Sequence, residues 1–113
     1  MAPTHYIDLE DGKKRVMNNT KLYTKLLGKF RDETKLDPVF AALETGNYEE
    51  AQSLTHAIKG IAANLSLVDF HEKIVELETQ IKAKSVDPKI IEAVKESLGS
   101  TLPEIEKVIA ENA

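Results

Sequence analysis

Apolar side chains recur at intervals of three and four residues along most of this chain, the period of an amphipathic α-helix. No alternation of apolar and polar positions predicts a pair of β-strands. The pattern predicts helices over 9–17, from 20 past 30, over 37–46 and 47–65, after a connection at 66–69, and from 87–88 onward. The positions expected to face the core are Leu22, Tyr23, Leu26, Leu27, Phe30, Val39, Phe40, Leu43, Phe70, Ile74, Leu77, Ile81, Ile90, Ile91, Val94, Leu98, Ile105, Val108 and Ile109.

The ends of these segments have residues that favour helix starts and stops. Asp8, Thr20 and Asn47 can each accept a backbone hydrogen bond as an N-cap. Asp-Pro pairs at 37–38 and 87–88 indicate two further starts, because proline is tolerated in the first helical turn. Each predicted helix therefore has a start signal or follows a short connection.

Two residues are expected to disturb the helices that contain them. Gly12 should weaken the first helix by about 1 kcal/mol relative to alanine. Pro103 should kink or restart the last helix, because proline lacks the amide hydrogen that a helix interior uses. Short connections favour antiparallel neighbours. The expected fold is all-α, an antiparallel (up-and-down) four-helix bundle with a short additional N-terminal helix.

Length and composition limit the classes of function. The chain has 113 residues and is expected to form a single domain, 1–113. It has no cysteine and a net charge of −4, which argues against thiolate metal sites and against nucleic acid as the main partner. No signal peptide or membrane span is recognised, so a cytoplasmic protein is expected. Met1 and the single-domain length favour a free-standing protein over a module of a larger kinase.

The segment 47–65 contains the most informative residues. On a helical wheel, one face gathers the apolar residues Ala51, Leu54, Ile58, Ile61 and Leu65. His56 lies roughly 180° from the centre of that face and should project to solvent from the middle of the helix. Lys59 follows one turn later, and Gly60 and Ala63 lie beside the histidine. These small side chains would leave a shallow surface that another protein could approach closely.

This combination suits phosphoryl transfer. A neutral imidazole is a nucleophile near neutral pH and needs no general base, because its ring nitrogen already has a lone pair. A lysine one turn away can neutralise phosphate oxygens. A glycine inside a helix costs about 1 kcal/mol relative to alanine, so Gly60 suggests that a side chain there would obstruct a partner.

The sequence His56-Ala57-Ile58-Lys59-Gly60, followed by 62–65, resembles the His-x-Leu/Ile-Lys-Gly motif of histidine-containing phosphotransfer (HPt) domains. The resemblance covers nearly the whole chain. It implies a four-helix bundle whose exposed histidine exchanges a phosphoryl group with receiver-domain aspartates. It assigns His56 as the phosphoryl acceptor, Lys59 as the phosphate neighbour and Gly60 as the clearance residue. The family usually has glycine where this chain has Ser66.

A further role follows from the resemblance, and a docking surface from the residues beside the histidine. In the phosphotransfer domains of chemotaxis kinases, a glutamate on the following helix orients the imidazole, and a gapless alignment assigns that role to Glu78. Candidate docking residues beside the histidine are Gln52, Ala63 and Asn64. The implied partners are response-regulator receiver domains and a histidine kinase or hybrid kinase. No cofactor or metal is expected on this chain, and Mg²⁺ would belong to the partner receiver domain.

Other interpretations remain open. His56 could be an ordinary surface histidine, Lys59 a solvated lysine, and Gly60 the site of a tight helix crossing. Glu78 could orient the imidazole, or it could be a solvated residue at the edge of its helix. The chain is expected to be a monomeric phosphocarrier and not an enzyme, because it has no recognisable ATP-binding motif. The alternatives are a receiver-binding helical adaptor without phosphoryl transfer and, more weakly, a hydrolase.

The other two histidines lie in less informative settings. His5 falls in the N-terminal segment and His71 opens a helix, where we expect it to be solvated. The histidines are too scattered for a zinc site, and no His-Glu-x-x-His spacing occurs. The sequence therefore concentrates its candidate chemistry on a single helix.

Overall fold

The structure is a computed structural model that describes residues 6–112. Those residues form helices joined by turns, with no strand among them. The helices are α1 (Leu9–Arg15), α2 (Thr20–Glu33), α3 (Asp37–Glu44), α4 (Tyr48–Asn64), α5 (Val68–Lys82) and α6 (Pro88–Glu111). The predicted all-α fold class is confirmed.

Of the three predicted N-caps, Asp8 and Asn47 are confirmed and Thr20 is not. The side chains of Asp8 and Asn47 each accept a hydrogen bond from the backbone amide three residues on, and Asp87 caps α6. The prediction for Thr20 is wrong, because Asn19 is the cap and Thr20 is already helical. The first helix is also shorter than predicted, because left-handed backbone at positions 17 and 18 ends it at Arg15.

Pro103 lies inside α6, which runs without interruption from Pro88 to Glu111. The predicted restart at this proline is therefore wrong. Proline removes the hydrogen bond to the carbonyl four residues earlier, which belongs to Gly99. Both residues are exposed, so water can bond the freed carbonyl and the helix continues.

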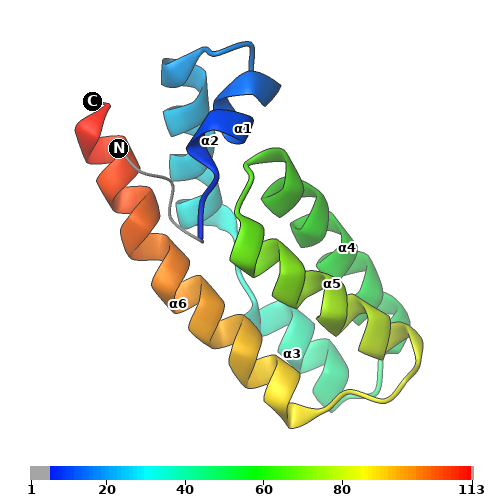
Figure 1. The fold of residues 1–113 in the computed structure, drawn as a ribbon. Helices are drawn as coiled ribbons and strands as arrows, with labels where there is room; N and C mark the ends of the chain where they lie inside the picture. Colours follow the sequence, from blue (N-terminus) through cyan, green and yellow to red (C-terminus); the bar gives the residue numbers. More distant parts are fainter. Residues whose placement is uncertain (1–5, 113) are drawn as a thin grey trace.

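The core is built where α4 packs on α3 and α5, and where α6 packs on α5 and α2. Figure 1 shows α4 and α5 side by side and α6 running along most of the molecule. Phe30 of α2 and Phe70 of α5 meet edge to face, with ring centroids 5.7 Å apart. The predicted core residues of α5 are all buried, whereas Leu22 of α2 is 39% exposed and its prediction is wrong.

Both α1 and α2 contact the turn between α4 and α5, α2 through Tyr23 and α1 through Asp11. The Tyr23 hydroxyl donates to the Leu65 carbonyl at 2.7 Å, and the Ser66 hydroxyl donates to Asp11 at 2.5 Å. Ser66 has a φ of 56°, the left-handed conformation for which glycine is the usual residue. A Cβ at Gly12 would lie 2.5 Å from the Tyr23 hydroxyl oxygen, so close packing requires this glycine. These contacts fix the end of α4.

The described part of the molecule is elongated, with principal extents of 42 × 20 × 20 Å. In Figure 1, α1 lies at one end and α3 towards the other, with α4 and α5 between them. Among residues 6–112, no helix is both long and apolar enough to cross a bilayer. In this elongated shape, the outer side of α4 extends over several helical turns along the length of the protein.

Candidate functional site

The buried face of α4 differs from the face predicted from hydrophobicity. Its buried residues are Ala51, Thr55, Ile58 and Ala62, followed by the cap residue Leu65. Leu54 is half-buried and packs against the core, whereas Ile61 is 43% exposed, so the assignment of Ile61 to the core is wrong. The reason is packing, because α4 is covered by α3 and α5 and not closely by α2.

This rotation of the buried face changes the position of the histidine. At 100° per residue, His56 lies about 140° from the centre of the observed buried residues, compared with the roughly 180° expected from the sequence. The shift brings the imidazole towards α5. The His56 side chain is 68% exposed, so the sequence prediction of a solvent-facing histidine is confirmed.

The imidazole is held on one side by a carboxylate of α5. Nδ1 of His56 lies 3.1 Å from Oε2 of Glu78. A carboxylate can only accept a hydrogen bond, so this contact requires a proton on Nδ1. In the neutral ring, that tautomer leaves Nε2 with a free lone pair. The arrangement therefore presents an unprotonated ring nitrogen on an exposed side chain.

Glu78 itself is almost completely buried, with 3% of its side chain exposed. The solvated edge position considered from the sequence is therefore wrong. Its second oxygen, Oε1, lies 2.5 Å from Nζ of Lys59, one turn beyond His56 on α4. One buried carboxylate thus has a cationic partner on one oxygen and the histidine on the other.

Two opposing influences act on the Glu78 carboxyl. Burial raises its pKa, because removal from water disfavours the charged form. Hydrogen bonds from Lys59 and His56 favour the charged form, and the charge of Lys59 and then of Lys82 adds to them. The net result is a Glu78 pKa below its ordinary value. The residue is an ionised carboxylate at neutral pH.

Lys59 is not the freely solvated lysine that the sequence left as an alternative. Its side chain is 27% exposed, and its ammonium group is paired with Glu78. Sequence reasoning did not foresee this pair. The sequence did contain a signal for it, because Glu78 follows Leu77 on the apolar face of α5 and Lys59 lies on the facing helix. Charged residues at such positions are rarely buried unless they are paired.

The surface around His56 has small residues. Gly60 is exposed, and a Cβ added there would find no atom within 4 Å. The tight helix crossing considered from the sequence is therefore not the reason for this glycine. Of the candidate docking residues, Gln52 and Ala63 are half-buried along the histidine side of α4, and Asn64 is exposed near its end.

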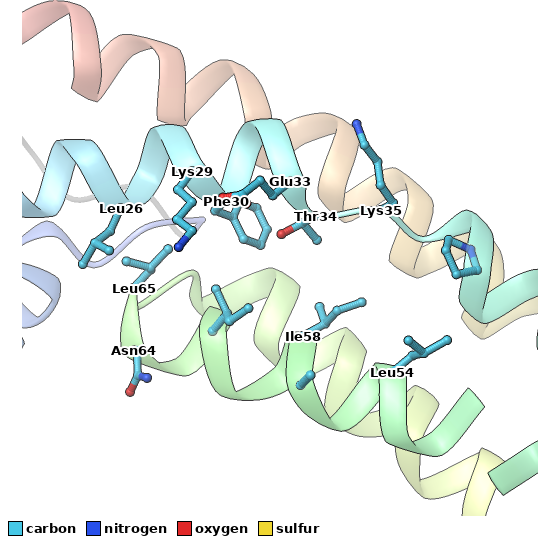
Figure 2. Close-up of a pocket in the computed structure, with 13 residues that line it drawn as sticks. Leu26, Lys29, Phe30, Glu33, Thr34, Lys35, Leu54, Ile58, Asn64 and Leu65 are labelled. Carbon is cyan, nitrogen blue, oxygen red and sulfur yellow. The ribbon is translucent and has the colours of Figure 1, made fainter. Parts of the chain in front are cut away.

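A groove of about 610 Å³ runs beside this surface, between α2 and α4. Figure 2 shows Leu54, Ile58 and Leu65 pointing from α4 towards α2, and Leu26 and Phe30 pointing back. Its remaining lining residues are Lys29, Glu33, Thr34, Lys35, Pro38, Ala57, Ile61 and Asn64. His56 does not line the groove, so no substrate-sized cleft surrounds the imidazole there. This geometry gives no support to the hydrolase alternative.

His71 lies apart from this site. His71 is half-buried in the first turn of α5, which differs from the solvated position expected for it. His5 lies outside the described residues. Within residues 6–112, no three acidic or histidine side chains gather in a way that could hold a metal ion. The described chemistry is concentrated on α4 and α5.

Comparison with known proteins supplies no relative for this chain. No family model matches it, and neither a curated protein nor a solved structure matches it significantly. A functional conclusion therefore depends on the motif around His56 and on the contacts that the imidazole makes.

Proposed function

We propose that this protein is a phosphorelay carrier of the histidine-containing phosphotransfer type. It accepts a phosphoryl group on His56 and passes it to a receiver-domain aspartate. The observation that supports this most is the exposed imidazole, 68% accessible, whose inner nitrogen is held 3.1 Å from a buried carboxylate. In this proposal, α2 with α3, then α4, α5 and α6 form an antiparallel four-helix bundle, and α1 is the additional N-terminal helix.

The proposed reaction needs little from the carrier. Nε2 of His56 attacks the phosphorus of an aspartyl phosphate on a donor receiver domain. The N–P bond forms as the P–O bond breaks, and the electron pair leaves with the donor carboxylate. Transfer to the second receiver reverses these steps. The carrier supplies a nucleophile in a fixed orientation, which is the usual contribution of a positioned group.

The residues around His56 have separate parts in this proposal. Glu78 orients the imidazole through Nδ1, and Lys59, whose ammonium pairs with Glu78, is the neighbour of the phosphoryl oxygens. Gly60 leaves room for a partner, and the open space over it agrees with that role because no internal contact explains the glycine. Gln52, Ala63 and Asn64 lie at the edge of the docking surface.

The proposed carrier has no catalytic machinery of its own for ATP. It acts without a cofactor, and Mg²⁺ is bound by the acidic pocket of the receiver domain. The partners are response-regulator receiver domains and a histidine kinase or hybrid kinase. A monomer in the cytoplasm suits these partners.

The test is phosphoryl transfer from a panel of radiolabelled, phosphorylated receiver domains. We expect acid-labile, base-stable label on the wild type and none on His56→Gln. The matched control is His71→Gln, which removes another histidine on a neighbouring helix and should accept label normally. All three proteins are compared by circular dichroism, so that loss of label can be separated from loss of fold.

The same experiment distinguishes the second class of function. If no receiver or kinase labels the wild type but receivers still bind it, the protein is a helical adaptor and the carrier proposal is wrong. Label that persists on His56→Gln would place the phosphoryl group on another residue and contradict the assignment of His56.

A further inference from the structure

Both oxygens of the Glu78 carboxylate are occupied. Oε2 faces Nδ1 of His56 at 3.1 Å, and Oε1 faces Nζ of Lys59 at 2.5 Å. With 3% of its side chain exposed, Glu78 cannot replace either partner with bulk water without moving out of the interface between α4 and α5. Whatever happens at the exposed nitrogen of the ring, this carboxylate remains beside the inner one.

We propose that Glu78 keeps the proton on Nδ1 of His56 throughout the phosphoryl-transfer cycle, so that the phosphorylated ring remains an imidazolium. The inference rests on the proposed carrier function and concerns the lifetime of the phosphoryl group on this site. Glu78 is a positioning residue in this scheme, because it acts through the ring and does not touch the phosphorus.

The proton balance follows from the tautomer. Before transfer, the neutral ring has its proton on Nδ1 and its lone pair on Nε2. When Nε2 forms the N–P bond, no proton leaves, and the ring gains one positive charge. That charge develops next to the Glu78 carboxylate. When the group is transferred onward or hydrolysed, the electron pair returns to Nε2 and the ring is again neutral with its Nδ1 proton.

The charged groups that act on the ring, directly or through Glu78, come from both packed helices. Lys59 belongs to α4, and Glu78 and Lys82 belong to α5. Lys59 keeps Glu78 ionised, as the lowered pKa of that carboxyl indicates. If Glu78 were neutral, it would no longer stabilise a proton on Nδ1 of His56. The Lys59 ammonium therefore supports the effect of Glu78 on the ring.

Protonation decides how easily the phosphoryl group leaves. A protonated phosphoimidazole releases a neutral imidazole, whereas a deprotonated one would release an imidazolate, which is a much poorer leaving group. Glu78 therefore makes the phosphorylated protein a ready donor at neutral pH and shortens the lifetime of the N–P bond.

The experiment uses phosphoramidate, a small phosphoryl donor that requires no partner protein. Wild type, Glu78→Gln and the matched control Glu72→Gln are phosphorylated, and loss of the group is followed by ³¹P NMR between pH 5 and 9. Glu72 lies on the same helix but is exposed. At pH 8 we expect Glu78→Gln to lose its phosphoryl group about tenfold more slowly, the change given by loss of a hydrogen bond to a charged group. At pH 5 all three rates should converge, because every ring is then protonated.

A second variant guards against a folding defect. Glu78→Gln leaves the Lys59 ammonium without its carboxylate, whereas Lys59→Gln with Glu78→Gln removes both charges. We expect the double variant to show the same slow loss at pH 8. ¹⁵N NMR of the unphosphorylated wild type should show the Nδ1–H tautomer of His56.

The inference is overturned if the rate profiles of wild type and Glu78→Gln superpose, or if the Nε2–H tautomer predominates. These outcomes are separate from failure of the carrier proposal. If the rate profiles are as expected but no receiver transfers its phosphoryl group to the protein, the phosphorelay is refuted and the effect of Glu78 on the ring is supported. Receivers that transfer normally to a protein whose profiles superpose would refute the effect of Glu78 alone.

Discussion

Replacing Gly12 with alanine separates the helix propensity of a residue from the packing around it. Propensity alone predicts that the alanine stabilises α1 by about 1 kcal/mol. In the structure, however, the added Cβ would lie 2.5 Å from the hydroxyl oxygen of Tyr23 and 2.6 Å from two of its ring carbons. Tyr23 is fully buried and its hydroxyl donates to the Leu65 carbonyl, so the ring has no free space to enter.

The size of the effect follows from these two terms. Overpacking a well-filled site costs about 1–3 kcal/mol. Three Tyr23 atoms would lie within 2.6 Å of the added Cβ, so we expect a cost in the upper part of this range, about 2–3 kcal/mol. After subtraction of the propensity gain of about 1 kcal/mol, we expect Gly12→Ala to lower the free energy of unfolding by about 1–2 kcal/mol. Gly60→Ala is the matched control, because both glycines are inside helices and the Cβ at Gly60 meets nothing within 4 Å. There the propensity term acts alone and should raise stability by about 0.5–1 kcal/mol.

Urea denaturation followed by circular dichroism measures both variants against the wild type. The expected result is a lower midpoint for Gly12→Ala and a higher midpoint for Gly60→Ala, with similar denaturant slopes. Equal or greater stability of Gly12→Ala would refute the reasoning, because it would show that Tyr23 moves aside without cost. Gly60→Ala should in addition accept phosphoryl groups poorly from receivers if the carrier proposal holds, despite its greater stability.

Three further predictions concern buried polar groups. Folding lowers the Glu78 pKa below its ordinary value of 4.5, so the contribution of this carboxyl to stability is present above that pH and is lost as the pH falls through the folded-state pKa. In urea titrations between pH 3 and 6, the free energy of unfolding of Glu78→Gln should therefore fall less with decreasing pH than that of the wild type. Burial raises the pKa of Tyr23 above its ordinary value of 10.0, so its stabilising effect is lost as the pH rises beyond that value, and Tyr23→Phe should reduce the alkaline loss of stability measured by thermal denaturation. The Thr101 hydroxyl is buried without a hydrogen-bond partner, so Thr101→Val should raise the free energy of unfolding by about 1 kcal/mol in the same urea assay, and a decrease would indicate a partner such as bound water.

The sequence predicted the helices well because their signals are local. Side chains such as Asp8 and Asn47 determine a helix start through contacts only three residues away, and apolar spacing identified all the buried apolar residues of α5. Thr20 failed as a cap because Asn18 adopts left-handed backbone and Asn19 is already in position to cap the helix. That choice depends on how α1 and α2 join, which local propensity does not contain.

The site was predicted only where it depends on one helix. The exposure of His56 follows from the apolar pattern of α4, whereas the buried face itself was misassigned because hydrophobicity favours Ile61 over Thr55. Thr55 is buried because its hydroxyl bonds the Ala51 carbonyl of its own helix at 2.7 Å, which removes the cost of burying it. The pairing of Lys59 with Glu78 depends on how α4 and α5 pack, and no spacing within either helix determines it.

The contacts of Glu78 also determine how the histidine should be replaced. His56→Ala would remove the hydrogen-bond partner of Oε2 and leave one side of a buried carboxylate with no donor, which is costly for a charged group. A loss of receiver binding in that variant could then come from movement of α5 and not from the missing nucleophile. His56→Gln retains an amide N–H donor on α4 while removing the ring nitrogen. It is therefore the substitution in which retained binding without transfer isolates the chemistry of the imidazole.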